Sequence, residues 1–397
     1  MDETEFAAGQ QLVSARVARI GKSAIHEMTR LAGMIEDVAF LSWAKPTSDT
    51  PEHIREAAVA AIRDGRVGGY SPTGGLPALR EAIAEKLARD NGINATPEEI
   101  IVTVGAIEGL AAAIMAAVDP GDEVLLPSPT YSTHIRQVIM ASAKPVLVPT
   151  LEERGFALDL DRMREAITPR TKAILYCSPS NPSGTVFGEE TLRQVAAIAR
   201  EHNLVVITDE AYEYFVYDDH RHFSIASLPE MRRHAISCFT FTKTYAMTGW
   251  RIGYLHADAD WIPQITKAHI PFAICAPTVS QYAALAALRG PQDCVADFQA
   301  HYRKARDRMC ARLDRLPDDF GYQRPGGSYL MFPRILASGG EDSIAFCKRL
   351  LREAKVSATP GIAFGPTGES HLRLSFCVPL ETIDLAFDRL EAYLGRA

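Results

Sequence analysis

FTFTKTYAMTGWRIGY, residues 239–254, joins a short apolar run to a lysine, Lys243, that stands among hydroxyl side chains such as Thr240 and Thr242. Arg251 follows eight residues after the lysine. Burying an ammonium group is costly unless the group is neutralised or hydrogen-bonded. One way to neutralise it is a Schiff base, in which the amine becomes an imine with an aldehyde cofactor. The stretch therefore indicates a lysine with a chemical role.

Outward from this stretch, apolar runs alternate with helical patterns through the middle of the chain. We expect strands at residues 100–104, 123–127, 172–177, 204–208 and 235–241. Helical patterns such as residues 105–118 and 192–201 lie between several of them. Strands that are apolar throughout and alternate with helices predict an α/β fold with a mainly parallel sheet, covered on both faces.

The pattern changes after Pro291, where a long charged amphipathic stretch covers residues 295–316. Shorter strands are expected at residues 328–332 and 371–376, before a closing helix that begins at Glu381. This change in pattern predicts a second, smaller α+β domain that the N-terminal residues complete. The expected division is a large domain over residues 47–290 and a small domain made of residues 1–46 and 291–397.

The composition limits the classes of partner. The 397 residues are 47% hydrophobic, which is more than one small core needs. The net charge is −7 and no basic block occurs, so nucleic acid and anionic membranes are disfavoured as partners. No apolar run is long enough to cross a bilayer. We expect small-molecule substrates instead.

The cysteines and the N-terminus bear on the compartment. The seven cysteines are scattered without CxxC pairs, a spacing that fits neither a zinc site nor a disulfide framework, and no metal is expected. The N-terminal residues, MDETEFAAGQQ, are acidic and polar, unlike a signal or transit peptide. Both features favour a cytoplasmic protein.

Polar residues follow several of the expected strands, at the ends where open parallel sheets bind ligands. Gly105 opens a helix and could present backbone N–H groups to an anion, although glycine before a helix is also ordinary turn chemistry. Asp209 needs a cationic partner if buried, or is a helix cap or structural salt bridge. Asn181, Tyr131 and Tyr212 are similarly placed, with a plain turn or aromatic packing as alternatives.

Six motifs, taken together and in order, resemble the fold-type I, class I/II aminotransferases that use pyridoxal 5′-phosphate. They are YSPTGGLPALREAI, VTVGAIEGL, SPSNPSGTV, TDEAYE, TKTYAMTGWRIGY and LRLSF. The similarity runs from about residue 49 to residue 379, and the motifs are specific in combination. The resemblance implies a mainly parallel seven-stranded sheet flanked by helices, plus the smaller domain.

The resemblance also implies roles around the cofactor ring. Lys243 would form the internal aldimine and, once freed by substrate, shuttle a proton between Cα and the cofactor. Asp209 would bond the pyridine nitrogen and keep it protonated, which makes the ring an electron sink. Asn181 and Tyr212 would hydrogen-bond the phenolic oxygen, and Tyr131 would stack on the ring face.

The phosphate would be held by a turn at a helix N-terminus together with hydroxyls and a guanidinium. The residues implied are Gly105, Ala106, Ile107, Thr240, Thr242 and Arg251. Tyr70 resembles the tyrosine that reaches the phosphate of a neighbouring subunit. The resemblance therefore implies a homodimer with shared active sites.

On the substrate side, Arg373 of HLRLSF matches the arginine that binds the α-carboxylate, with Asn181 beside it. Read alone, an arginine between two leucines on a strand could simply face solvent. The family's usual glycine before a proline is replaced by Ala44 and Lys45, so Trp43 and Lys45 could face the substrate entrance, with a packed Trp beside an exposed Lys as the alternative. Trp43 and Ala44 are candidate substrate contacts. No clear second arginine for an acidic side chain is visible, so a dicarboxylate-only enzyme is not supported.

The implied reaction is ping-pong transamination between an L-amino acid and a 2-oxo acid such as 2-oxoglutarate or pyruvate. Two alternatives remain at this stage. The same first intermediate can lead to elimination, decarboxylation or cyclisation, so a lyase, decarboxylase or cyclase shares the motifs. A non-enzymatic, ligand-sensing regulator is the other, but the chain has no N-terminal DNA-binding module and no basic face.

Overall fold

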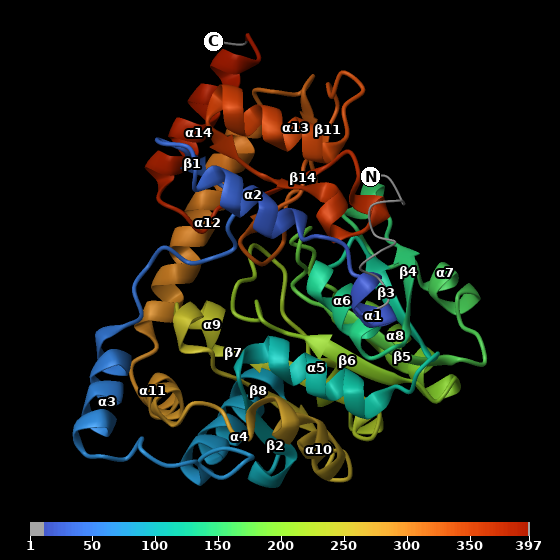
Figure 1. The fold of residues 1–397 in the computed structure, drawn as a ribbon, viewed down its shortest axis with the longest axis vertical. Helices are drawn as coiled ribbons and strands as arrows, with labels where there is room; N and C mark the ends of the chain where they lie inside the picture. Colours follow the sequence, from blue (N-terminus) through green and yellow to red (C-terminus); the bar gives the residue numbers. More distant parts are fainter. Residues whose placement is uncertain (1–11, 396–397) are drawn as a thin grey trace.

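The computed structural model describes residues 12–395, and its centre is a seven-stranded sheet that crosses the lower part of Figure 1. In spatial order the strands are β2 (Ile100–Thr103), β8 (Gly253–Ala257), β7 (Ala235–Thr240), β6 (Val205–Asp209), β5 (Thr171–Cys177), β3 (Glu123–Ser128) and β4 (Lys144–Pro149). Strand β8 is antiparallel to both of its neighbours, and the other pairs are parallel. The mainly parallel α/β sheet predicted from the sequence is confirmed.

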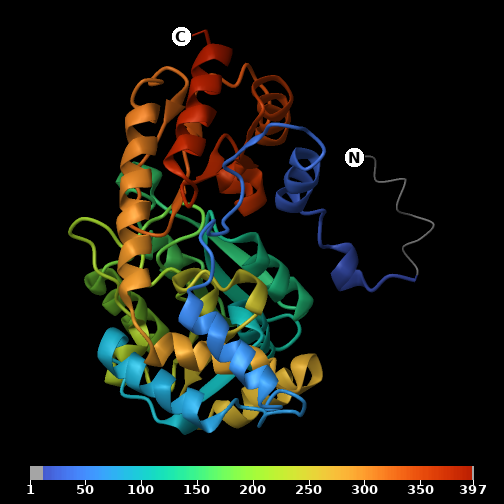
Figure 2. The ribbon, with the colours of Figure 1, turned by 90° about the vertical axis from the view of Figure 1, so that its left-hand side faces the viewer.

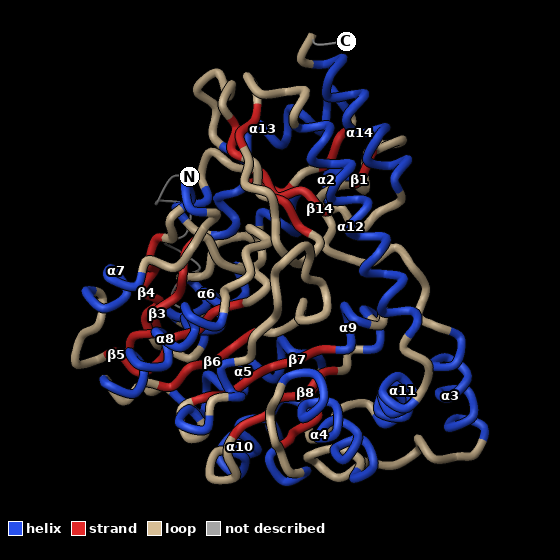
Figure 3. Tube along the Cα trace, turned by 180° about the vertical axis from the view of Figure 1, so that it is seen from behind, coloured by secondary structure: helices blue, strands red, loops and turns tan. Residues whose placement is uncertain are grey.

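Helices cover both faces of this sheet, as Figure 3 shows from behind. They are α3 (Glu52–Arg63), α4 (Pro77–Asn91), α5 (Gly105–Ala117), α6 (Ser132–Met140), α7 (Leu160–Glu165), α8 (Glu189–Glu201), α9 (Phe241–Thr244), α10 (Ile262–Ala273) and α11 (Thr278–Arg289). Alternate residues of one strand belong to different cores: Leu175 packs with α5 and α10, whereas Ile174 packs with α8. Because both faces are covered, the strands are apolar throughout, as their sequence required.

The remaining elements come from the two ends of the described chain and, apart from the first short helix, which lies beside α6, they lie above the sheet in Figures 1 and 2. The helices are α1 (Ala15–Ala18), α2 (Ala24–Ala32), α12 (Asp293–Leu313), α13 (Ser343–Arg349) and α14 (Leu380–Tyr393). The strands are β1 (Ala39–Phe40), β9 (Phe320–Gly321), β10 (Leu330–Met331), β11 (Arg334–Ile335), β12 (Val356–Ser357), β13 (Thr359–Pro360) and β14 (Leu372–Ser375). Strand β1 pairs with β12 in parallel, so the N-terminal segment is tied to the C-terminal one.

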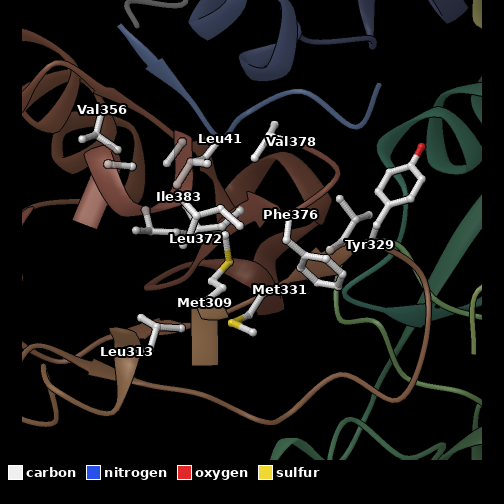
Figure 4. Close-up of a cluster of buried hydrophobic side chains, with 14 of the residues drawn as sticks. Leu41, Met309, Leu313, Tyr329, Met331, Val356, Leu372, Phe376, Val378 and Ile383 are labelled. Carbon is white, nitrogen blue, oxygen red and sulfur yellow. The ribbon is translucent and has the colours of Figure 1, made fainter. Parts of the chain in front are cut away.

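A separate apolar core holds these terminal elements together (Figure 4). Leu41 from the N-terminal segment packs with Met309 of α12 and Leu372 of β14. The same cluster includes Tyr212 and Phe215, which follow β6 of the large sheet. The core therefore reaches from the terminal segments to the end of the sheet where β6 stops.

Some predicted boundaries shift by a few residues. The strand expected at residues 328–332 is reduced to Leu330–Met331, because Ser328 has a left-handed backbone with φ of 57°. The strand expected at residues 204–208 ends one residue later, so that Asp209 is its last residue. Over residues 12–395, the structure contains no helix that is both long and apolar enough to cross a membrane.

Glu152 links the two groups of elements and yields a stability prediction. It follows β4, receives a hydrogen bond of 2.9 Å from Arg334 Nε of β11, and lies 3.1 Å from His371 Nε2 beside β14. Burial raises the pKa of this carboxyl, but hydrogen bonds and charges from His371 and Arg334 outweigh burial and hold the pKa at about 2. Folding therefore favours the ionised form.

We expect Glu152→Gln to lower the free energy of unfolding at pH 7 by about 1 kcal/mol. Because the folded pKa is depressed, this contribution is present above the ordinary carboxyl pKa of 4.5 and is lost as the pH falls toward about 2. Urea unfolding from pH 7 down to pH 3 would test this, with the exposed Glu153→Gln as the matched control. A difference between wild type and Glu152→Gln that does not shrink in acid would contradict the assignment.

Candidate active site

A cavity of about 630 Å³ opens beside the carboxyl ends of β6 and β7, where α6 and the segment after β1 also contribute. Most of the residues singled out in the sequence line it: Trp43, Ala44, Ala106, Ile107, Tyr131, Asn181, Asp209, Tyr212, Thr240, Thr242, Lys243, Arg251 and Arg373. Gly105 lies against Arg251, and Tyr70 lies elsewhere on the surface. Residues from distant parts of the chain thus meet in one place.

Lys243 reaches the cavity from α9, the short helix that directly follows β7. Its Nζ donates a hydrogen bond of 2.8 Å to the carbonyl oxygen of Ala44 and lies 5.9 Å from the ring centre of Tyr212. Burial is the main cause that lowers the pKa of this amine from 10.5 to about 8; Arg373 acts in the same direction, and Cys377 and Asp209 oppose it. An amine with this pKa is neutral in a far larger fraction at pH 7 than an ordinary lysine.

Asp209 is the last residue of β6 and is 7% exposed. One oxygen, Oδ1, accepts a hydrogen bond of 3.2 Å from the backbone N–H of Ala211. The other, Oδ2, lies 3.1 Å from Nε2 of His134, a fully buried histidine on α6. The second ring nitrogen of His134 lies 3.3 Å from the hydroxyl of Thr130. Asp209 is thereby held in one orientation, with its carboxylate in the cavity wall.

Sequence reasoning did not predict the contact between His134 and Asp209. In the sequence, 75 positions separate His134 from Asp209. No spacing in the sequence signals that contact, because the strand order alone brings the end of β6 beside α6. An apolar-looking helix position occupied by histidine, next to Tyr131, is the one signal that was present.

Tyr212 and Asn181 both line the cavity and are 4% and 5% exposed. Burial raises the pKa of Tyr212 well above its ordinary value, so its hydroxyl stays protonated and can act as a donor. The ring of Tyr212 packs edge-on against Tyr329, with 5.1 Å between ring centres. This packing holds Tyr212 in the cavity wall, which Asn181 and Lys243 also line.

Arg373 is buried on β14, at 2% exposure, so the alternative of a solvent-facing arginine is wrong. Its Nη2 donates to the carbonyl oxygen of Ser42 at 2.6 Å and to the hydroxyl of Thr359 at 3.3 Å, and Nη1 donates to Asn181 Oδ1 at 3.4 Å. Its Nε is buried without a hydrogen-bond partner. No carboxylate of residues 12–395 forms an ion pair with this guanidinium. A buried cation of this kind is suited to a bound anion.

The N-terminus of α5 and Arg251 form a second cationic corner. Gly105 has a positive φ of 73°, and a Cβ there would lie 2.5 Å from Arg251 Nη2. Only glycine lets the guanidinium approach this close to the first turn of the helix. The hydroxyl of Thr240 donates to that of Thr242 at 2.8 Å. Backbone N–H groups, two hydroxyls and a guanidinium at one corner match the chemistry of a phosphate site.

Two of the singled-out residues lie at the edges of this arrangement. Tyr70 is 82% exposed, and within a single chain it does not line the cavity. Trp43 is 42% exposed, and its indole Nε1 donates a hydrogen bond of 2.9 Å to the hydroxyl of Thr29 of α2. In the part of the chain that the structure describes, no group of three or more His, Cys, Asp or Glu side chains is placed to hold a metal ion.

Comparison with known proteins gives a consistent result. The family model for aminotransferase class I and II matches residues 37–390. The chain is 40% identical over 385 residues to an aspartate aminotransferase of Pyrococcus abyssi, covering 96% of this chain and 98% of the relative. It is 38% identical over 385 residues to aromatic-amino-acid aminotransferase 2 of Thermococcus litoralis, with the same coverage.

Solved structures agree with the sequence relatives. The aromatic aminotransferase from Pyrococcus horikoshii superposes with a TM-score of 0.87 at 39% identity, covering 94% of this chain and 98% of that one. The aspartate aminotransferase from Thermus thermophilus with maleate superposes with a TM-score of 0.90 at 36% identity, covering 96% and 99%. Both the fold and the sequence are shared over nearly the full length.

Proposed function

Because this chain belongs to the class I and II aminotransferase family, we propose that the cavity at Lys243 binds pyridoxal 5′-phosphate and transfers an amino group from an L-amino acid to a 2-oxo acid. The chain is an aminotransferase enzyme by its relatives. The observation that carries the cofactor proposal is the cavity itself. It combines a lysine of lowered pKa with Asp209, Arg251 and Arg373.

The donor set suits each part of this cofactor. The phosphate would be bound by Arg251 and by the N-terminal turn of α5, at Gly105, Ala106 and Ile107, with the hydroxyls of Thr240 and Thr242. Asp209 would hold the pyridine nitrogen, and His134 would keep its carboxylate in place. Asn181 and Tyr212 would donate to the phenolic oxygen, and Tyr131 would lie against the ring face.

The work of the protein in the reaction can be stated residue by residue. When bound, pyridoxal 5′-phosphate supplies an aldehyde that takes up the amino group and a ring that withdraws electrons from Cα. Arg373 binds the α-carboxylate of the substrate and thereby orients its Cα–H bond toward Lys243. Lys243 accepts the proton from Cα and returns it to the cofactor side, a general acid–base role that its lowered pKa favours.

The second half of the reaction uses the same residues in reverse. A 2-oxo acid enters after the first oxo acid leaves, and Arg373 binds its carboxylate in the same way. Lys243 then moves the proton back to the Cα position, so one cavity serves both substrates in a ping-pong sequence. Trp43 and Ala44, which line the cavity beside Lys243, are proposed as substrate contacts.

Assembly and domain organisation are part of the same proposal. We propose a homodimer in which Tyr70, 82% exposed in the single chain, binds the cofactor phosphate of the partner subunit. Residues 47–290 would form the cofactor-binding domain, and residues 1–46 and 291–397 the small domain, of which residues 1–11 and 396–397 lie outside the described part. The enzyme is proposed to be cytoplasmic. Sedimentation equilibrium measures the assembly. A protein that is monomeric by this measurement and still fully active would contradict the shared site.

A panel of L-amino acids tested against several 2-oxo acids, with the cofactor absorbance as the readout, tests the function. We expect each good amino donor to convert bound cofactor to the pyridoxamine form and each good 2-oxo acid to restore it. Release of ammonia without the pyridoxamine form would contradict transamination and favour a lyase. A purified protein that never takes up pyridoxal 5′-phosphate would contradict the cofactor assignment.

A further inference from the structure

The cavity contains more positive charge than the proposed cofactor and an α-carboxylate require. Its charged Lys, Arg and Asp side chains are Lys45, Arg136, Asp209, Lys243, Arg251 and Arg373. In the proposed function, Arg251 binds the phosphate, Arg373 binds the α-carboxylate and Lys243 pairs with the aldehyde. With Asp209 at the ring nitrogen, two cations remain without a proposed partner.

Arg136 is the better placed of these two. It lies on α6, one turn after Ser132 and Thr133, which line the same wall of the cavity. Its side chain is half-buried, whereas Lys45 is exposed and its Nζ lies 5.9 Å from the ring centre of Trp43. A guanidinium also offers two parallel N–H donors to a carboxylate, which an ammonium does not.

Arg136 has no anionic partner of its own. Its Nη2 donates a single long hydrogen bond, 3.3 Å, to the carbonyl oxygen of Gly21. Across the described residues, no Asp or Glu oxygen lies within 4.0 Å of this guanidinium, whereas the buried Arg306 is paired with Asp218. An unpaired arginine in a cavity wall is available to a ligand.

We propose that Arg136 binds the side-chain carboxylate of dicarboxylic substrates, both the amino acid and the 2-oxo acid. The proposal rests on the proposed transamination and names the substrate class of that site. Arg373 on β14 and Arg136 on α6 then bind the two ends of one dicarboxylate, with Lys243 lining the same cavity. In the sequence no clear second arginine for an acidic side chain was visible, because HIRQ, the stretch that contains Arg136, matches no motif.

Equilibrium binding of two unreactive acids to the holoenzyme tests this separately from turnover. Glutarate and pentanoate have the same carbon chain and differ only in the distal carboxylate. We expect glutarate to bind the wild type about 10- to 100-fold more tightly, and Arg136→Gln to bind both acids equally with its pentanoate affinity unchanged. An unchanged preference for glutarate in Arg136→Gln would overturn the proposal.

The first half-reaction gives a second test. With Arg136→Gln, the rate constant kcat/KM for cofactor conversion should fall about 10- to 100-fold for L-glutamate and stay unchanged for L-alanine, and Arg136→Lys should restore part of the loss. A larger loss in Lys45→Gln than in Arg136→Gln would assign the carboxylate to Lys45 and overturn the proposal. Equal losses for alanine and glutamate would overturn it too, leaving transamination intact. If no amino acid converted the cofactor of the wild-type protein, that result would instead contradict the proposed function.

Discussion

Lys243→Ala should reduce transamination by at least about 10³-fold while leaving the protein folded and able to bind pyridoxal 5′-phosphate. The size follows from the proposed role of the amine, which moves a proton at Cα in both half-reactions. Alanine has no titratable group, and the proposed phosphate contacts at Arg251 and Gly105 remain in place. Steady-state rates and cofactor retained after desalting would measure the two effects separately.

Three controls for this variant test the charge at position 243, the rescue by an added amine and the effect of losing another lysine. Lys243→Arg keeps a cation but not a neutral amine, so it should be as inactive as Lys243→Ala. A small primary amine added to Lys243→Ala should recover part of the rate, because it can enter the cavity and carry the proton. Lys45→Ala, at an exposed lysine of the same cavity, should lose far less activity with L-alanine. Wild-type rates in Lys243→Ala would refute the proposed mechanism.

Asp209→Asn should lower kcat/KM by about 10³-fold. Asparagine has nearly the same shape, so the packing around β6 should be kept. The change removes the negative charge that would keep a pyridine nitrogen protonated, and it leaves one acceptor oxygen between Ala211 N–H and His134 Nε2 where the carboxylate has two. Without that charge the ring withdraws electrons from Cα less strongly, and proton transfer to Lys243 slows.

Spectroscopy and stability separate this effect from simple unfolding. The absorbance of bound cofactor in Asp209→Asn should respond to pH differently from the wild type, since the ring nitrogen has lost its anionic partner. The urea midpoint should change little. Asp260→Asn, an exposed aspartate with 82% side-chain exposure, serves as the matched control and should keep wild-type rates. Normal turnover in Asp209→Asn would show that the carboxylate has no electrostatic role.

Much of the fold was predictable from the sequence, because a strand that is apolar throughout is stable only when both of its faces are buried. The runs around residues 172–177 and 235–241 became β5 and β7 almost as expected. Short strands were less predictable. Leu330–Met331 is only two residues long, and the left-handed backbone at Ser328 sets its limit. Such a boundary depends on the hydrogen bond that the Ser328 N–H donates to the carbonyl oxygen of Phe215, far away in the chain.

The candidate site divides in the same way. Lys243, Asp209 and Arg373 were identified by the motifs around them, since each stands at the end of or within an apolar strand where a charge needs an explanation. His134 and Arg136 were not identified as site residues, because both lie on one amphipathic helix, where polar residues normally face solvent. Their neighbours in space, Asp209 and the segment at Gly21, are more than seventy residues away in the chain.

The sequence alone therefore determined the α/β sheet, the lysine that follows β7 and the residues proposed to surround it, because local pattern and motif order carry that information. Only the tertiary structure decided that Arg373 is buried with a free Nε, that His134 holds Asp209, and that Arg136 enters the cavity unpaired. Burial and ion pairing depend on which strands and helices become neighbours. That order arises from crossovers in the chain, and no local pattern encodes it.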